Sequence, residues 1–159
     1  GYYTFRELYP QFVGELGVET LHMSELIERA IGDGKLKLGE MKCKVTYQDP
    51  CKLGRSLGVY DAPRRVLGAI EGLELVEMPR NRQDAFCCGS SNWVTCTSCN
   101  KLIQYERLRE AKKTGADVLV TACPKCRIHF SCAMFDGDGD VRTEIRDITN
   151  LVAQSIGAR

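Results

Sequence analysis

The order of apolar and polar positions along the chain alternates between helical spacing and short β-rich runs. Helical spacing predicts helices over residues 4–16, 24–31, 62–70, 100–113 and 127–134. Pro10 is expected to kink or restart the first helix, and Ser24 is the predicted N-cap of the second. Strands are predicted over residues 18–23, 42–47, 73–78 and 116–122, the last as a nearly continuous apolar run. Strands that alternate with helices predict an α/β fold with Rossmann-like layers around a mainly parallel sheet.

Two cysteines follow predicted strands directly. Cys51 comes after residues 42–47 through Asp49-Pro50, and Cys123 comes immediately after residues 116–122. Ligands of α/β proteins collect outside the carboxyl ends of the strands. The sequence therefore predicts cysteines gathered at that edge of the sheet.

Composition narrows the class of protein. With 159 residues, the chain has the length of one domain, and 22 basic against 21 acidic residues give no electrostatic reason to expect nucleic acid as a partner. Nine cysteines exceed ordinary usage, but their odd number and the 43% hydrophobic content argue against a small secreted disulfide scaffold. No segment approaches the length of apolar chain that spans a membrane, so no direct membrane span is expected. A reducing, cytoplasmic location is the default expectation, and it is compatible with attachment to a membrane complex.

Five cysteines form a pattern that packing alone does not require. Cys51 is followed after 35 residues by Cys87-Cys88, and 34 further residues, the first of them Gly89, lead to Cys123-Pro-Lys-Cys126. Coordination to a cation converts clustered thiols to thiolates, so a soft metal or an iron–sulfur cluster explains the pattern. Four-cysteine zinc sites usually consist of two C-x-x-C pairs. The five cysteines here favour iron–sulfur, with zinc as the alternative.

Further residues carry weaker signals. Cys96 and Cys99 form a second C-x-x-C, either a redox pair or, as we favour, buried small hydrophobic residues at a helix start. Cys43 and Cys132 are expected to be core thiols, and Trp93 is expected to pack. His129 is expected to pack on its helix or to face solvent rather than donate a hydrogen bond or proton near the site, and His22 carries no signal. Basic side chains near the cysteines either offset cluster charge, bind an anionic thiol substrate or lie on the solvated surface; these are Arg55, Arg80, Arg82, Lys125 and Arg127.

The segments DPCKLGR, AFCCGSS and VTACPKCRIHF resemble the CCG, or cysteine-rich, domain found in the B and D subunits of heterodisulfide reductases, in register over residues 40–132. This resemblance implies a noncubane 4Fe-4S cluster held by Cys51, Cys87, Cys88, Cys123 and Cys126, with a substrate disulfide cleaved at its iron atoms. It also implies other iron–sulfur or flavin subunits as partners and a small thiol disulfide as substrate. One departure concerns the segment after Gly89, which reads SSNWVTCTSCNK where many relatives have a glycine-rich run.

Two other functions stay open at this point. A structural zinc domain of a redox complex would use four of the five cysteines to stabilise the fold. A quinone-linked electron-transfer subunit would keep the cluster and have no disulfide substrate. The chain has no Walker loop, no G-x-G-x-x-G and no H-E-x-x-H, so nucleotide binding and zinc protease chemistry find no support.

The two ends of the chain resemble each other. A shift of 125 residues superimposes SELIERAIG on TNLVAQSIG and aligns Phe5 with Phe130. Members of the resembled family usually carry two copies of the domain. We therefore expect residues 1–159 to form a single module, of which residues 1–38 are the tail of an upstream repeat and residues 40–132 the motif-bearing core.

Overall fold

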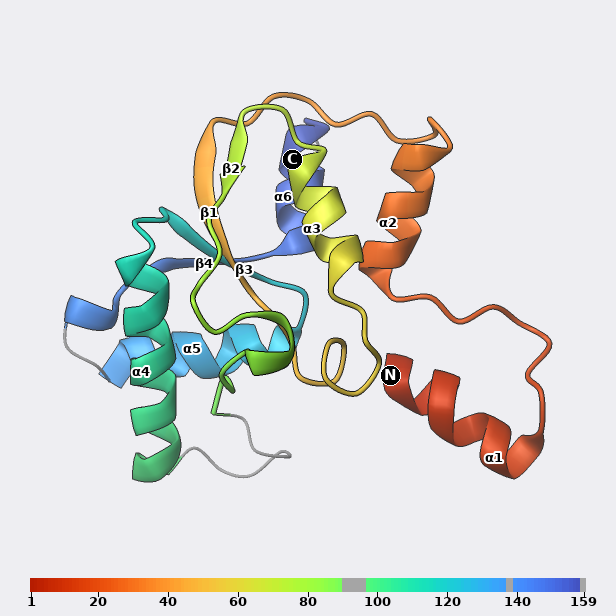
Figure 1. The fold of residues 1–159 in the computed structure, drawn as a ribbon, viewed down its shortest axis with the longest axis horizontal. Helices are drawn as coiled ribbons and strands as arrows, with labels where there is room; N and C mark the ends of the chain where they lie inside the picture. Colours follow the sequence, from red (N-terminus) through yellow and green to blue (C-terminus); the bar gives the residue numbers. More distant parts are fainter. Residues whose placement is uncertain (90–96, 137–138, 158–159) are drawn as a thin grey trace.

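A parallel β-sheet organises the computed structural model, which describes residues 1–89, 97–136 and 139–157. Its strands are β1 (Cys43–Gln48), β2 (Leu73–Leu75), β3 (Val118–Thr121) and β4 (Glu144–Asp147). In the described part of the chain they lie in the order β2-β1-β3-β4, and every neighbouring pair is parallel (Figure 1). The predicted α/β fold with a parallel sheet is confirmed.

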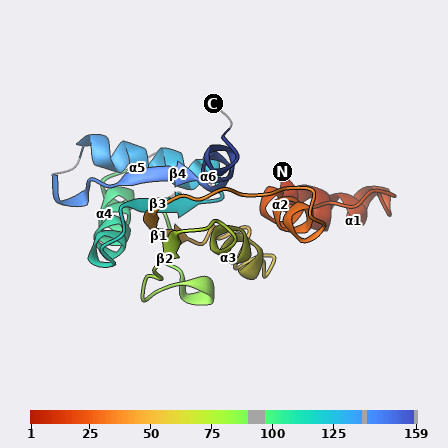
Figure 2. The same ribbon diagram turned by 90° about the horizontal axis from the view of Figure 1, so that it is seen from above.

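Helices cover both faces of this sheet. One face packs against α3 (Asp61–Gly68) and α6 (Ile148–Ser155), and α2 (Met23–Gly32) packs in turn against α3. The other face packs against α4 (Ser98–Lys113) and α5 (Pro124–Asp136). Figure 2 shows the sheet between these two layers. All four residues of β3 are buried, as its continuous apolar run predicts for a central strand.

The N-terminal segment projects away from the sheet (Figures 1 and 2). It consists of a π-helical turn, η1 (Thr4–Leu8), and the short helix α1 (Tyr9–Val13), in whose first turn Pro10 lies. The predicted restart at Pro10 is confirmed, because proline needs no hydrogen-bond acceptor for its nitrogen in a first turn. Its exposed apolar side chains are Phe5, Tyr9, Phe12 and Val13.

Three details of the sequence-based prediction are wrong. Residues 18–22 form no strand, since the described part of the chain offers this segment no strand to pair with. The N-cap of α2 is His22 and not Ser24: the His22 ring accepts a hydrogen bond from Ser24 N at 3.2 Å, and the Glu25 carboxylate accepts one from His22 N at 2.9 Å. The strand predicted over residues 73–78 ends at Leu75, after which the chain leaves the sheet and reaches the 3₁₀ turn η2 (Arg82–Asp84).

The 125-residue shift aligns corresponding features of the two chain ends. It superimposes His22 on Asp147, and each of these residues caps the helix that follows it. The two aligned helices differ in burial, however, since Leu26 of α2 is 48% exposed and its counterpart Leu151 of α6 is fully buried. The strand β4 follows the 3₁₀ turn η4 (Gly139–Val141). It belongs to the C-terminal one of the two similar segments, and there it pairs with β3. That residues 1–38 belong to an upstream repeat stays a prediction.

None of the helices in the described ranges has both the length and the apolar content needed to cross a lipid bilayer.

Candidate metal centre

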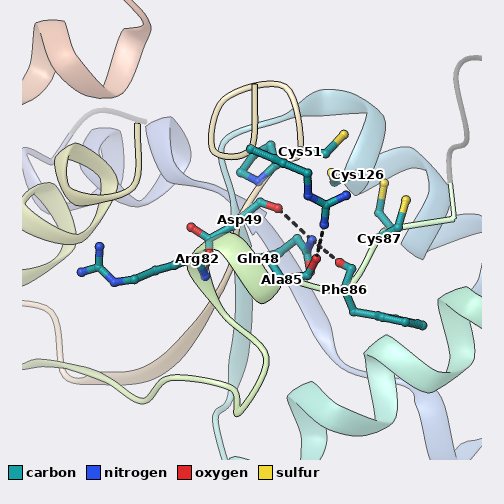
Figure 3. Close-up of a pocket in the computed structure, with 11 residues that line it drawn as sticks. Gln48, Asp49, Cys51, Arg82, Ala85, Phe86, Cys87 and Cys126 are labelled. Atoms are coloured by element: carbon teal, nitrogen blue, oxygen red, sulfur yellow. Dashed lines mark hydrogen bonds between the residues drawn. The ribbon is translucent and has the colours of Figure 1, made fainter. Parts of the chain in front are cut away.

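Four of the five patterned cysteines line one pocket at the carboxyl edge of the sheet, and these are Cys51, Cys87, Cys88 and Cys126. Figure 3 shows the sulfur atoms of Cys51, Cys87 and Cys126 gathered on the same side of this pocket. Cys123 lies beside it, since its thiol interacts with Cys126 by a hydrogen bond and electrostatically with Cys88. We call this group of five the sulfur site.

Local backbone geometry positions two of the three cysteine segments. After β1, the chain turns at Pro50, whose carbonyl accepts hydrogen bonds from Leu53 N at 3.0 Å and Gly54 N at 2.8 Å, so that Cys51 lies within a tight turn. After β3, α5 begins with Pro124, which places Cys123 directly before the helix and Cys126 in its first turn. The partial positive charge of a helix N-terminus favours thiolate at this place.

The third segment reaches the site by packing against α4. Gly89 has φ = +76°, a conformation that glycine adopts without strain. A β-carbon at this position would lie 2.7 Å from Gln104 Cγ and 2.8 Å from the backbone oxygen of Asn100. The glycine of Cys-Cys-Gly therefore lets the two preceding cysteines approach the sheet edge beneath α4.

The thiols of the sulfur site do not ionise alike. A hydrogen bond from Cys126, helped by backbone N–H groups of the helix start, lowers the pKa of Cys123 to about 6 despite its burial. Hydrogen bonds to neighbouring thiols and burial raise the pKa of Cys126, and the same two causes raise that of Cys87. Several sulfurs this close become thiolates together only when a cation offsets their mutual repulsion.

A buried ion network fixes the chain on either side of the site. The Asp49 carboxylate binds both Nη atoms of Arg64, at 2.7 and 2.9 Å, and accepts a hydrogen bond from Arg82 N at 2.8 Å. Arg64 also binds Glu77 through two contacts, at 2.5 and 3.0 Å. Arg82 is held at φ = +54°, unusual for a residue with a side chain. The Asp-Pro-Cys turn and the chain leading to Cys87 are thereby tied together.

The basic residues predicted near the cysteines separate into two groups. Arg55 and Arg82 line the pocket, and Arg55 donates a hydrogen bond to the Ala85 carbonyl at 2.9 Å. Arg80 is one step removed: its guanidinium stacks on the Phe86 ring at 4.1 Å and pairs with acidic residues of α4. The pocket lining, as far as the described residues form it, does not include Lys125 or Arg127.

The other candidate cysteines and histidines lie apart from the pocket lining. Cys99 is exposed at the start of α4, so the expectation that it is a buried hydrophobic residue is wrong. Cys43 and Cys132 are partly buried, and Cys43 stands at the opposite end of β1. His129 is buried on α5 and contacts the side-chain amide of Gln104 at 3.2 Å. Cys96 and Trp93 fall outside the described residues.

Sequence reasoning missed three polar residues around the pocket: Gln48, Arg107 and His22. Gln48 lines the pocket from the end of β1, and Arg107 of α4 binds its side chain. His22 hydrogen-bonds to the backbone of Ala122, next to Cys123. Arg107 gave no signal because it lies in a strongly charged stretch, which is typical of a solvated helix face. The buried face of α4 includes Gln104, Arg107 and Glu110 alongside its apolar residues.

The donor atoms of the pocket fit a thiophilic metal group. Among the described residues of the lining, sulfur atoms predominate as ligands, and the carboxylate of Asp49 is occupied by Arg64. Over residues 1–89, 97–136 and 139–157, no three His, Cys, Asp or Glu side chains are arranged around a single metal ion, so the ligand set of the sulfur site stays a prediction.

Comparison with known proteins identifies the family of this chain. The family model described as "Cysteine-rich domain", CCG, matches residues 45–131, which contain all five residues of the sulfur site. The chain belongs to the CCG family. The predicted resemblance is confirmed, and the pocket described above is the place where this CCG domain brings together cysteines from three separate segments.

The relatives of this CCG domain are longer redox proteins, and the chain matches a part of each. The chain is 37% identical to the D subunit of the dihydromethanophenazine:CoB–CoM heterodisulfide reductase of Methanosarcina acetivorans, over 94% of the chain and 37% of that relative. It is 36% identical to a probable membrane-anchored ferredoxin of Chromohalobacter salexigens and 30% identical to the EtfAB:quinone oxidoreductase of Syntrophomonas wolfei, covering 94% and 96% of the chain and 22% of each relative. The chain thus spans little more than a third of the length of the first relative, and the names support an iron–sulfur subunit of a redox complex.

Proposed function

We propose that this CCG domain holds a noncubane 4Fe-4S cluster through Cys51, Cys87, Cys88, Cys123 and Cys126 and reduces a thiol disulfide within a heterodisulfide-reductase-like complex. The observation that carries the proposal is the convergence of cysteines from three separate segments on one pocket. The relative named as the D subunit of a heterodisulfide reductase supports the reaction. The partners we propose are subunits with iron–sulfur or flavin groups, and the relative named a membrane-anchored ferredoxin supports attachment of such a complex to a membrane.

The residues around the pocket have distinct roles in this proposal. When bound, the cluster would pass on to the disulfide the two electrons that partner redox subunits deliver, and cleavage to two thiols takes up two protons as well. Arg55 lines the pocket and would offset the negative charge of the thiolates, which favours an anionic substrate at its mouth, whereas the Arg82 guanidinium pairs with Asp61 at 2.7 Å. The network of Asp49 and Arg64 holds the Cys51 turn against the chain that precedes Cys87. These residues keep the sulfur atoms in place while the charge of the site changes.

A second candidate is an electron-transfer subunit that has no disulfide substrate. The relative named EtfAB:quinone oxidoreductase favours it. Reduced, anaerobic protein mixed with a small thiol disulfide distinguishes the two: oxidation of the protein, with two thiols released for every two electrons that it gives up, supports the reductase, whereas no reaction supports the electron relay.

Metal content tests the cluster itself. Anaerobically prepared protein should contain about four iron and four sulfide per chain, and serine at each residue of the sulfur site should lower iron content. Cys132→Ser is the matched control, because Cys132 lies on the same helix as Cys126 but does not line the pocket. A colourless protein with one zinc and no iron would refute the proposal.

For the domain organisation we propose that residues 1–38 close an upstream copy of the same fold. Support comes from the 125-residue shift, which superimposes the caps His22 and Asp147, and from the short share of each relative that the chain covers. An upstream gene sequence without a second Cys-Cys-Gly would contradict this proposal.

A further inference from the structure

A fully buried guanidinium lies one side chain away from the sulfur site. Arg107 of α4 is 0% exposed, and its Nε donates to Gln48 Oε1 at 2.5 Å. Its Nη1 donates to the Arg80 carbonyl at 2.8 Å and pairs with Glu110 Oε2 at 3.0 Å, while its Nη2 is buried without a hydrogen-bond partner among the described residues. An unsatisfied buried donor destabilises a fold, so packing gives no reason for arginine here.

Arg107 determines how the Gln48 amide is oriented. A guanidinium only donates hydrogen bonds, so the amide oxygen of Gln48 faces Arg107 and its nitrogen faces the other way. That nitrogen donates to the carbonyls of Asp49 and Phe86, each at 3.0 Å. Phe86 directly precedes Cys87 and Asp49 lies two residues before Cys51, so one side chain links the two cysteine segments. Figure 3 draws these bonds of Gln48 as dashed lines to Asp49 and Phe86.

Arg107 is a fixed charge among several others behind the pocket. Within the described ranges Glu110 is the acidic side chain that pairs with it, and Glu110 also binds Arg80 through its side chain and through Arg80 N at 2.8 Å. Asp49, whose carboxylate is bound by Arg64, also attracts Arg107 electrostatically. A guanidinium stays protonated in proteins, so replacing Arg107 alone would make this region more negative.

We propose that Arg107 is a positioning residue of the sulfur site: through Gln48 it holds the Asp49 and Phe86 backbone in place, and its charge stabilises the reduced state of the group bound there. The second half of this inference rests on the proposed function. A fixed cation in a region of low dielectric favours the state with one more electron and raises the reduction potential. The first half concerns the protein alone and holds with no metal bound.

Two variants separate the hydrogen bonds from the charge. Arg107→Met removes both, whereas Arg107→Lys keeps the charge and loses the planar fork that binds Gln48 and Arg80 together. Arg109→Met is the matched control, because Arg109 lies on the same helix, carries the same charge and is about half exposed in a pair with Asp140.

The first measurement uses metal-free protein and iodoacetamide, with alkylation of Cys87 followed by peptide fragmentation in a mass spectrometer. Both Arg107 variants should react about tenfold faster than the parent, the factor that corresponds to one lost hydrogen bond of typical strength. Arg109→Met should react at the parent rate. Unchanged rates in both Arg107 variants would overturn the positioning role, whatever the parent protein binds.

The second measurement is a redox titration of iron-loaded protein, followed by absorption and electron paramagnetic resonance. Arg107→Met should have a more negative midpoint potential, while Arg107→Lys and Arg109→Met should stay close to the parent. Should Arg107→Met fail to retain iron, Arg107→Lys decides, because a midpoint potential clearly more negative than that of the parent, although the charge is kept, would refute the role of the charge. A parent protein without iron would refute the proposed function but leave the alkylation result standing.

Discussion

The ion network behind the Cys51 turn offers a sharp test, because the chain contains its own control. Arg64 and Arg65 are consecutive residues of α3, yet the Arg64 side chain is 9% exposed and bound to Asp49 and Glu77, while that of Arg65 is 60% exposed and bound to Glu28. Burial by itself would lower the pKa of Arg64, but its hydrogen bonds to the two carboxylates raise it. We therefore compare Arg64→Met with Arg65→Met.

The expected loss follows from the burial of Asp49, whose side chain is 2% exposed. Removing one partner of a buried ion pair leaves a buried charge uncompensated and typically costs about 3–5 kcal/mol. For a chain of this length, that corresponds to a fall of roughly 6–20 °C in the melting temperature. Arg65→Met should melt close to the parent, since water and salt screen an exposed pair.

Thermal and urea unfolding, both followed by circular dichroism under anaerobic conditions, measure the difference. The double variant Asp49→Asn with Arg64→Met should regain part of the loss, because it removes the uncompensated carboxylate. If Arg64→Met and Arg65→Met are equally stable, Asp49 does not depend on Arg64 and the reasoning is wrong.

Two further predictions concern a glycine and a histidine. Gly89→Ala should destabilise the domain and lower its iron content more than Gly58→Ala does. Both glycines have positive φ, but a β-carbon meets Gln104 and Asn100 only at Gly89. If urea unfolding shows the same loss of stability in both variants, the whole effect is backbone strain and the close contact at Gly89 has no part in it. Burial lowers the pKa of His22 from its ordinary value of 6.5, so the folded state binds fewer protons and stability falls as pH drops below about 6.5 toward the folded pKa. His22→Asn keeps an N-cap that does not titrate, so urea unfolding between pH 7.5 and 5.5 should show a smaller loss in the variant, and identical slopes would contradict the cap assignment.

Periodicity predicted the fold well where the sheet itself imposes the pattern. The strand around Val118–Thr121 is buried on both faces, so its sequence is continuously apolar and easily recognised. Residues 18–22 have the same β-rich composition but no neighbouring strand in the described part of the chain, and they stay irregular. Strand formation depends on pairing at long range, which a local pattern does not reveal.

The cysteines of the site were predictable and the residues that support them were not. Spacing shows which cysteines belong together, because thiols in that order have no other common purpose. Arg107 reads as a surface residue, since its burial depends on Gln48, which is 59 positions away in the chain. His22 has no distinguishing neighbours in sequence, and its contact with Ala122 arises only in the folded chain.

The buried polar residues of the described chain make the core less stable than apolar residues in their place would. Most of them border the carboxyl edge of the sheet or the helices above the Cys-Cys-Gly segment; among them are Gln48, Asp49, Gln104, Arg107 and His129. Apolar residues of similar volume at these places would commonly give an equal or more stable core. Hydrogen bonds, however, fix direction as well as distance, and the two irregular segments that carry Cys51, Cys87 and Cys88 need both to meet the start of α5, where Cys123 and Cys126 lie. The polar network is therefore best understood as the part of this CCG domain that holds sulfur atoms in fixed positions on a stable α/β core.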